Sequence, residues 1–235
     1  MSDLFHAASV KVRRGRKHIA DVAPAFSAVS VHQDGFLKAA RAMGLPIGRA
    51  AFISELAIPE SAMDEIACCV GDAVHNLRSA LDLLPCEVVE RTPNGNPNQV
   101  HFPFAETEKG LTEQTDKSPK GGALKGKNFH RAREDARDLL LALAPHGEAH
   151  GNALLWGLHR LDLIDKHQDL LSLSHDVRKP GLYFLGATLP TGGSLPPRLV
   201  FAPGNLFAGQ EIVATLNLIA GEVEDAVERF ASLGW

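Results

Sequence analysis

The chain has 235 residues, of which 45% are hydrophobic and 22% are charged, and its formal net charge is −4. This apolar content is enough for a sizeable core, which excludes a disordered chain and a disulfide-stapled miniprotein. Cys68, Cys69 and Cys86 form no CxxC pair, so we expect reduced thiols. No apolar run approaches the roughly 20 residues of a membrane helix, and no signal-peptide core is visible, so we expect a cytoplasmic protein without a membrane segment.

The first part of the chain is predicted to be mainly helical. Residues 1–30 have the composition of one helix interrupted near Pro24, and residues 48–56 are typical of a short strand. From Pro59 onward, apolar residues recur at intervals of three and four until Pro85, which can stop a helix. This pattern predicts an amphipathic helix between the two prolines.

The middle of the chain alternates between loops and helices. Residues 91–127 are rich in Pro, Asn, Gly, Thr and Lys, which predicts a long connection with one extended piece, VHFPF, at 100–104. Residues 129–143 form a predicted helix that ends at Pro145. Residues 151–173 form another, whose apolar side chains lie on nearly every side, as in a helix surrounded by other elements.

The last part of the chain predicts a hairpin and a helix. Residues 182–189 and 198–202 have the pattern of two paired strands, and residues 212–233 return to helical periodicity. Together these elements predict one α+β domain over residues 1–235. It is mainly a helical bundle around a central buried helix, residues 151–173, with a small antiparallel sheet.

Small and polar side chains gather on one face of the helix that ends near Pro85. At 100° per residue, His75 and Asp82 lie opposite the core residue Leu77. Asn76 and Arg78 lie on the two flanks. A solvated helix face usually carries Lys, Glu and Gln, which are better helix formers, so this face is typical of a second contact surface. Hydrogen bonding to neighbouring helices is the structural alternative to a functional role.

A carboxylate lies within the apolar stripe of the helix predicted for residues 151–173. Asp165 falls about 40° from Leu161, so we expect Asp165 to be buried. A buried carboxylate needs a cation or hydrogen-bond donors, which His75, Asn76 or Arg78 could supply. We therefore expect the two helices to pack against each other. Such a cluster is either a structural ion-pair network or part of an active site.

Two sequence strings carry a resemblance to a known family. The strings GDAVHNLRSALD at 71–82 and LHRLDLIDKHQDLL at 158–171 resemble the signature segments of a bacterial family of proteins of unknown activity. VHFPF resembles the extended segment between them. The resemblance covers roughly residues 10–175 and implies a mainly helical cytosolic protein. Leu83 stands where this family commonly has His after the first string's Asp, which argues against a mechanism based on that imidazole.

A second resemblance concerns one spacing. Arg160 and His167 are separated by six residues, which is similar to the active-site motif of HEPN-type ribonucleases, helical bundles that cut RNA without metal, often as dimers. In such a reaction His75 and His167 would transfer protons, and Arg78 or Arg160 would stabilise charge on the phosphorane. The full set of candidate catalytic residues is His75, Asn76, Arg78, Asp82, Arg160, Asp165, Lys166 and His167.

Three further histidines raise the question of a metal site. His146 and His150 stand four residues apart, as two zinc ligands on one helix do, and His159 follows. Pro145 and Gly151 interrupt such a helix. We therefore expect these histidines to cap loops, and we expect neither a metal ion nor another cofactor.

Two functions of different class follow from these observations. The first is a binding or regulatory module whose polar core is structural. The second is a HEPN-like, metal-independent ribonuclease or a related hydrolase. A cleft that exposes both strings favours the enzyme, and full burial favours the module. The acidic balance argues against broad nucleic-acid binding, although the basic clusters at 13–17 and 117–133 could contact phosphates, so RNA, a second protein or another copy of the chain are the partners to consider.

Overall fold

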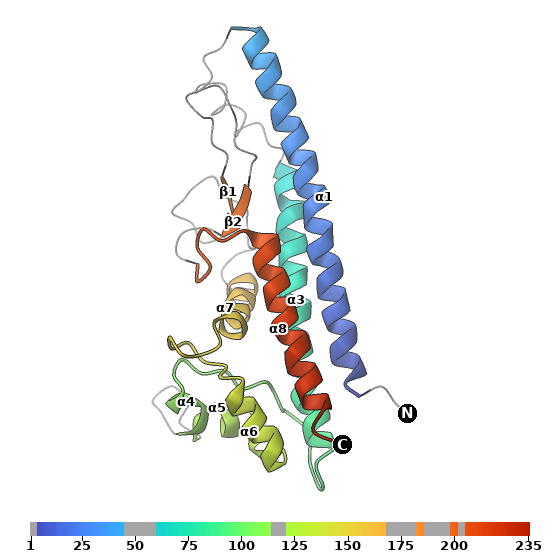
Figure 1. The fold of residues 1–235 in the computed structure, drawn as a ribbon, viewed down its shortest axis with the longest axis vertical. Coiled ribbons are helices and arrows are strands. Elements are labelled where there is room, and N and C mark those ends of the chain that lie inside the picture. Colours follow the sequence, from blue (N-terminus) through green and yellow to red (C-terminus); the bar gives the residue numbers. More distant parts are fainter. Residues whose placement is uncertain (1–3, 45–59, 114–120, 168–181, 186–197, 202–204) are drawn as a thin grey trace. The chain divides into compact units, whose positions relative to one another are not determined.

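The computed structural model describes residues 4–44, 60–113, 121–167, 182–185, 198–201 and 205–235 (Figure 1). In chain order its elements are α1 (His6–Ala42), α3 (Glu60–Glu90), α4 (Lys109–Thr112), α5 (Gly122–Gly126), the 3-10 helix η1 (Phe129–Arg131), α6 (Glu134–Ala142), α7 (Ala153–His167), β1 (Leu182–Leu185), β2 (Arg198–Phe201) and α8 (Ile212–Ala231). Within these ranges, no helix combines the length and apolar character that a bilayer span requires.

The chain divides into two compact units. Unit 1 consists of Met1–Arg16, Val74–Leu163 and Asn217–Trp235, and unit 2 consists of Lys17–Ala73 and Ile164–Leu216. Helices α1, α3, α7 and α8 each contribute residues to both units. The expected single domain stays a prediction.

The predicted helical class is confirmed, but the α+β class is not supported. Strands β1 and β2 form one antiparallel ladder, which runs from Leu182 opposite Phe201 to Leu185 opposite Arg198. A two-stranded ladder of this length is a hairpin and offers no layer on which helices could pack. In the described part of the chain, the core is therefore built by helices.

Helix α1 continues through Pro24, where an interruption was expected. A proline has no amide hydrogen, so the carbonyl group of Ala20 loses its helical partner. Ala20 and Pro24 are both exposed, and water can satisfy that carbonyl. The prediction was wrong because a proline on the solvent side of a long helix costs less than one in a buried turn.

Helix α3 likewise contains Pro85, which was expected to end it, and extends to Glu90. The residues beyond the proline explain this extension. Val88 and Val89 are both 0% exposed, and each buried valine contributes about 1.5 kcal/mol or more. Together they offset the roughly 3 kcal/mol that an interior proline costs.

The expected connection over residues 91–127 contains two short helices, α4 and α5. In unit 1, α4 packs against α5, and α5 against η1 (Figure 1). The segment at 100–104 is not part of a strand, yet Val100 and Phe102 are buried. Directly after it, Ala105 forms an isolated parallel bridge with His146.

The remaining helix predictions agree with the structure in part. The helix expected for residues 129–143 is split into η1 and α6, because Ala132 has extended backbone angles. Helix α8 closely matches the prediction for residues 212–233. The strand expected at 48–56 lies outside the described residues, as do residues 168–173 of the central helix.

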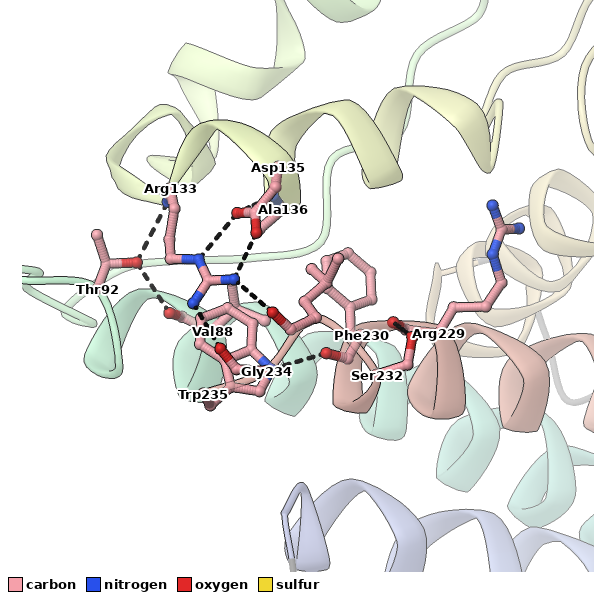
Figure 2. Close-up of polar contacts among 11 residues, drawn as sticks. Val88, Thr92, Arg133, Asp135, Ala136, Arg229, Phe230, Ser232, Gly234 and Trp235 are labelled. Atoms are coloured by element: carbon pink, nitrogen blue, oxygen red, sulfur yellow. Dashed lines mark hydrogen bonds and ion pairs between the residues drawn. The ribbon is translucent and has the colours of Figure 1, made fainter.

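In unit 1, the side chain of Arg133 holds the last residues of the chain (Figure 2). Its Nη2 donates a hydrogen bond to the carbonyl oxygen of Leu233 at 2.9 Å. Its Nη1 donates to the carbonyl oxygen of Gly234 at 3.1 Å, and its Nε donates to Asp135 at 2.8 Å. The guanidinium carbon also lies 4.2 Å from the ring centre of Trp235. One planar group therefore joins the start of α6 to the chain after α8.

We expect Arg133→Lys to lower the free energy of unfolding by about 1–2 kcal/mol, as measured by urea denaturation. Lysine keeps the charge but loses the planar fork that reaches two carbonyl oxygens and a carboxylate at once. Arg14→Lys is the matched control, because Arg14 is exposed on α1, and its effect should stay below about 0.5 kcal/mol. Equal stabilities for the two variants would contradict the role assigned to Arg133.

Candidate functional site

Helices α3 and α7 pack against each other, as predicted from the two sequence strings. In unit 1, His75 Nδ1 lies 3.5 Å from Asp162 Oδ1. In unit 2, Gly71 lies so close to Asp165 that a Cβ atom at Gly71 would be 2.9 Å from Asp165 Oδ1. Each unit thus contains a contact between the two helices.

The buried carboxylate of α7 is Asp162. Its side chain is 6% exposed, whereas Asp165 has intermediate exposure. The expected burial of Asp165 is therefore only partial. Leu155 and Leu158 are also buried, and Asp162 lies between their directions around the helix. Asp165 stands two residues before the end of α7.

Polar and aromatic side chains gather around Arg78 in unit 1. We call this group the Arg78 cluster; it consists of His75, Arg78, Asp82, Phe104, His159 and Asp162. The side chain of Arg78 is 9% exposed, and its Nη1 lies 2.7 Å from Asp82 Oδ1. Its guanidinium carbon lies 4.8 Å from the ring centre of Phe104. The positive charge is therefore balanced by a carboxylate on one side and contacts an aromatic face on another.

The segment at 100–104 is attached to α3 and α7 through this cluster. The ring of Phe104 stacks on the imidazole of His159, with 4.4 Å between ring centres and 4° between ring planes. The backbone amide of Phe102 donates a hydrogen bond to Asp82 Oδ1 at 3.4 Å. Among the described residues, Arg78 Nε has no hydrogen-bond partner, and Nη1 lies within ion-pair distance of Asp82 but outside hydrogen-bond geometry. The aromatic contact therefore replaces part of the lost hydration.

His159 is a neutral member of the cluster. Burial and, to a smaller extent, the positive charge of Arg78 lower the pKa of His159 to about 4, against the opposing effect of Asp162. The ring is therefore uncharged at neutral pH. It packs as an aromatic group between Phe104 and Trp156, whose ring centre is 5.5 Å away.

Not all of the predicted candidates in unit 1 join the cluster. Asn76 accepts a hydrogen bond from Lys11 Nζ at 3.5 Å, and therefore faces α1. Arg160 is exposed. It stands two residues before Asp162, about 200° around the helix, so the two side chains leave α7 on opposite sides. Arg160 is thus not the charge stabiliser for a reaction at His75.

The candidates in unit 2 do not form a second described cluster. Asp165 lies beside Gly71, and Lys166 is exposed. His167 is the last residue of α7, but its side chain lies outside the described residues. The HEPN-like spacing of Arg160 and His167 therefore stays a prediction.

Sequence reasoning missed Phe104, His159 and Asp162 as members of the cluster. All three lie within the strings that carry the family resemblance, so the strings identified the right segments. The pairing of Phe104 with His159 joins residues that are 55 positions apart. Helical periodicity describes only one helix at a time, and it cannot predict such a contact.

The histidines considered for a metal site divide into two groups. His159 stacks on Phe104, away from the others. His146 and His150 instead lie together with Glu148, and one ligand atom of each lies within 4.8 Å of the other two. Glu148 was not among the expected ligands, because its position does not give the HExxH order of a zinc-binding helix.

Comparison of the chain with known protein families, with curated proteins and with solved structures found no match. The functional interpretation therefore depends on the geometry of the described residues.

The approach of Gly71 to Asp165 can be tested with two glycines that both lie inside helices. An alanine at Gly221 in α8 would meet no atom within 4 Å, so Gly221→Ala should raise the free energy of unfolding by about 0.5–1 kcal/mol. Gly71→Ala gains the same helix propensity but drives a methyl group into the Asp165 carboxylate. We expect it to lower the free energy of unfolding by about 1–2 kcal/mol in urea denaturation. A gain for both variants would show that α3 and α7 are farther apart.

The neutral state of His159 predicts a pH dependence of stability. Between pH 6.5, its ordinary pKa, and about 4, the unfolded chain binds a proton at this imidazole and the folded chain does not. The stabilisation is therefore complete above pH 6.5 and is lost as the pH falls. We expect His159→Gln to remove about 1–2 kcal/mol of the decrease in unfolding free energy between pH 7 and pH 4.5. An NMR titration of His159 near pH 6.5 would contradict this assignment.

Proposed function

We propose that the protein is a binding or regulatory module and that the Arg78 cluster is part of its core. The observation that carries this proposal is the enclosure of Arg78, whose side chain is 9% exposed and is engaged by both Asp82 and Phe104. A group that binds a substrate has to present donors to a solvent-connected site. The guanidinium of Arg78 is instead used inside the fold, where it fixes the segment at 100–104 against α3.

The charges of the cluster also support a structural role. Arg78 is paired with Asp82, His159 is neutral, and the buried carboxylate of Asp162 lies beside His75. Buried ionic groups of this kind are costly to desolvate, and a pairing such as that of Arg78 with Asp82 favours one docking of the elements that carry them. The cluster therefore fits a set of contacts that selects one packing of α3 and α7.

The proposal also includes the family to which the protein belongs and its location in the cell. The strings at 71–82 and 158–171 lie on helices that pack against each other, which supports membership of the bacterial family that they resemble. We also propose a cytoplasmic location. The partner classes are RNA, a second protein or another copy of the chain, and the exposed Arg13 and Arg14 of α1 support contact with phosphates.

A specific observation favours a second function, a metal-independent hydrolase that acts on RNA. The side chain of His75 is 49% exposed, and the carboxylate next to it, Asp162, is 6% exposed. A buried carboxylate beside an accessible imidazole is the pairing found in enzymes that use His as a general base. His75 could then remove a proton from a 2′-hydroxyl group.

One experiment separates these two functions. Wild-type protein, His75→Ala and the control His130→Ala, which removes an exposed histidine of η1, are incubated with single-stranded RNA in EDTA. The melting temperature of each is measured in the same buffer. The module predicts no cleavage by any of the three, and a lower melting temperature for His75→Ala because Asp162 loses a neighbour. The hydrolase predicts cleavage by the wild type and the control, and a loss of about 100-fold or more in His75→Ala without a change in melting temperature.

A further inference from the structure

Two loops of unit 1 bring four potential metal ligands together. Glu148 Oε2 lies 3.8 Å from His146 Nδ1 and 3.9 Å from His150 Nε2. Glu108 Oε2, from the other loop, lies 3.1 Å from His150 Nε2. Four ligands at about 2.1 Å from a tetrahedral zinc ion are about 3.4 Å from one another. The three observed separations lie on both sides of that value, so they are compatible with ligands that share one metal ion.

His146 provides a second, independent indication of a ligand. Its side chain is 1% exposed, and Nδ1 makes no hydrogen bond within the described part of the chain. A buried ring nitrogen without a partner costs about 1–3 kcal/mol. Its nearest carboxylate is Glu148, at 3.8 Å, which is too long for a hydrogen bond. A cation placed between the two atoms would satisfy both.

The backbone fixes the two loops against each other. Ala105 N donates to the carbonyl oxygen of Pro145 at 3.3 Å, and Gly147 N donates to the carbonyl oxygen of Ala105 at 3.2 Å. Glu108 N also donates to Glu148 Oε2 at 2.7 Å, which holds that carboxylate beside the imidazoles. The position of the ligands therefore results from the fold, while the exposed side chains of Glu108 and His150 can still move.

We propose that His146, Glu148, His150 and Glu108 bind a divalent transition-metal ion of the zinc class. Two imidazoles and two carboxylates favour zinc over magnesium or calcium, which prefer oxygen ligands alone. Four protein ligands leave no open position for a substrate, so the ion would be structural. It would clip the loop that follows Phe104 to the loop that precedes α7.

The test uses the full chain, dialysed against EDTA and then freed of the chelator. Zn²⁺ is added in an isothermal titration, Co²⁺ is followed by its visible absorption, and the melting temperature is measured with and without Zn²⁺. The variant is His150→Ala, whose side chain is 63% exposed and whose loss should not prevent folding. The control is His130→Ala, an exposed histidine outside the cluster.

We expect one Zn²⁺ per chain, a tetrahedral Co²⁺ spectrum and a higher melting temperature with Zn²⁺ for the wild type and the control. His150→Ala should bind at least about 100-fold more weakly and lose the shift in melting temperature. Absence of Zn²⁺ binding by the wild type would overturn the proposal, and so would equal binding by His150→Ala. These outcomes are independent of whether the protein cleaves RNA.

Discussion

A guanidinium group with 9% of its side chain exposed has lost most of its hydration, and the chain around Arg78 has to replace it. Asp82, one turn along α3, supplies the opposite charge, and Phe104 supplies an aromatic face. Because Phe104 stacks in turn on His159, the same interaction connects α3, the segment at 100–104 and α7. Three parts of unit 1 are thus held in place by the need to balance one buried charge.

The position of this segment has consequences beyond the cluster. Ala105 follows Phe104 directly and makes the backbone bridge to His146. The loop that carries Glu108 therefore begins at a residue that Arg78 fixes, and it ends beside Glu148 and His150. The Arg78 cluster and the proposed metal site therefore lie at the two ends of one short segment, which runs from Phe104 to Glu108. A substitution that loosens the packing of Phe104 would therefore disturb both the Arg78 cluster and the proposed metal site.

Much of the helical framework could be predicted from periodicity. Helices α3 and α8 start close to where the sequence indicated, because a continuous apolar stripe needs no knowledge of distant residues. The ends were less predictable. Pro85 did not stop α3, because Val88 and Val89 beyond it are buried and stabilise the last turns of the helix. The sequence alone does not show whether these valines will be buried. The α+β class is not supported for a related reason, because the two short strands form a single ladder and have no further strands with which to build a layer in the described residues.

The candidate site was predictable by segment but not by residue. The segments that carry His75, Arg78 and Asp162 were identified, whereas helical periodicity favoured Asp165 over Asp162 as the buried carboxylate. His146 and His150 were compared with zinc ligands on a helix. Pro145 and Gly151 would interrupt such a helix, so no metal site was expected. In a tight turn the same spacing brings both rings and Glu148 together, since a turn reverses the chain within these few residues.

Histidines were predicted either to transfer protons or to cap loops, but the surroundings of each ring in unit 1 determine which chemistry it can perform. His159 is enclosed by Phe104 and Trp156, and its lowered pKa leaves a neutral ring that packs as an aromatic side chain. His146 is buried more deeply, with 1% of its side chain exposed, and in the described part of the chain its Nδ1 makes no hydrogen bond although a carboxylate is near, which suits a metal ion. His75 combines solvent access with a buried carboxylate, so of these three rings it alone could exchange protons with a substrate. Histidine thus fits three different roles within unit 1, and the burial of each ring and its distance from a carboxylate determine which role it fits.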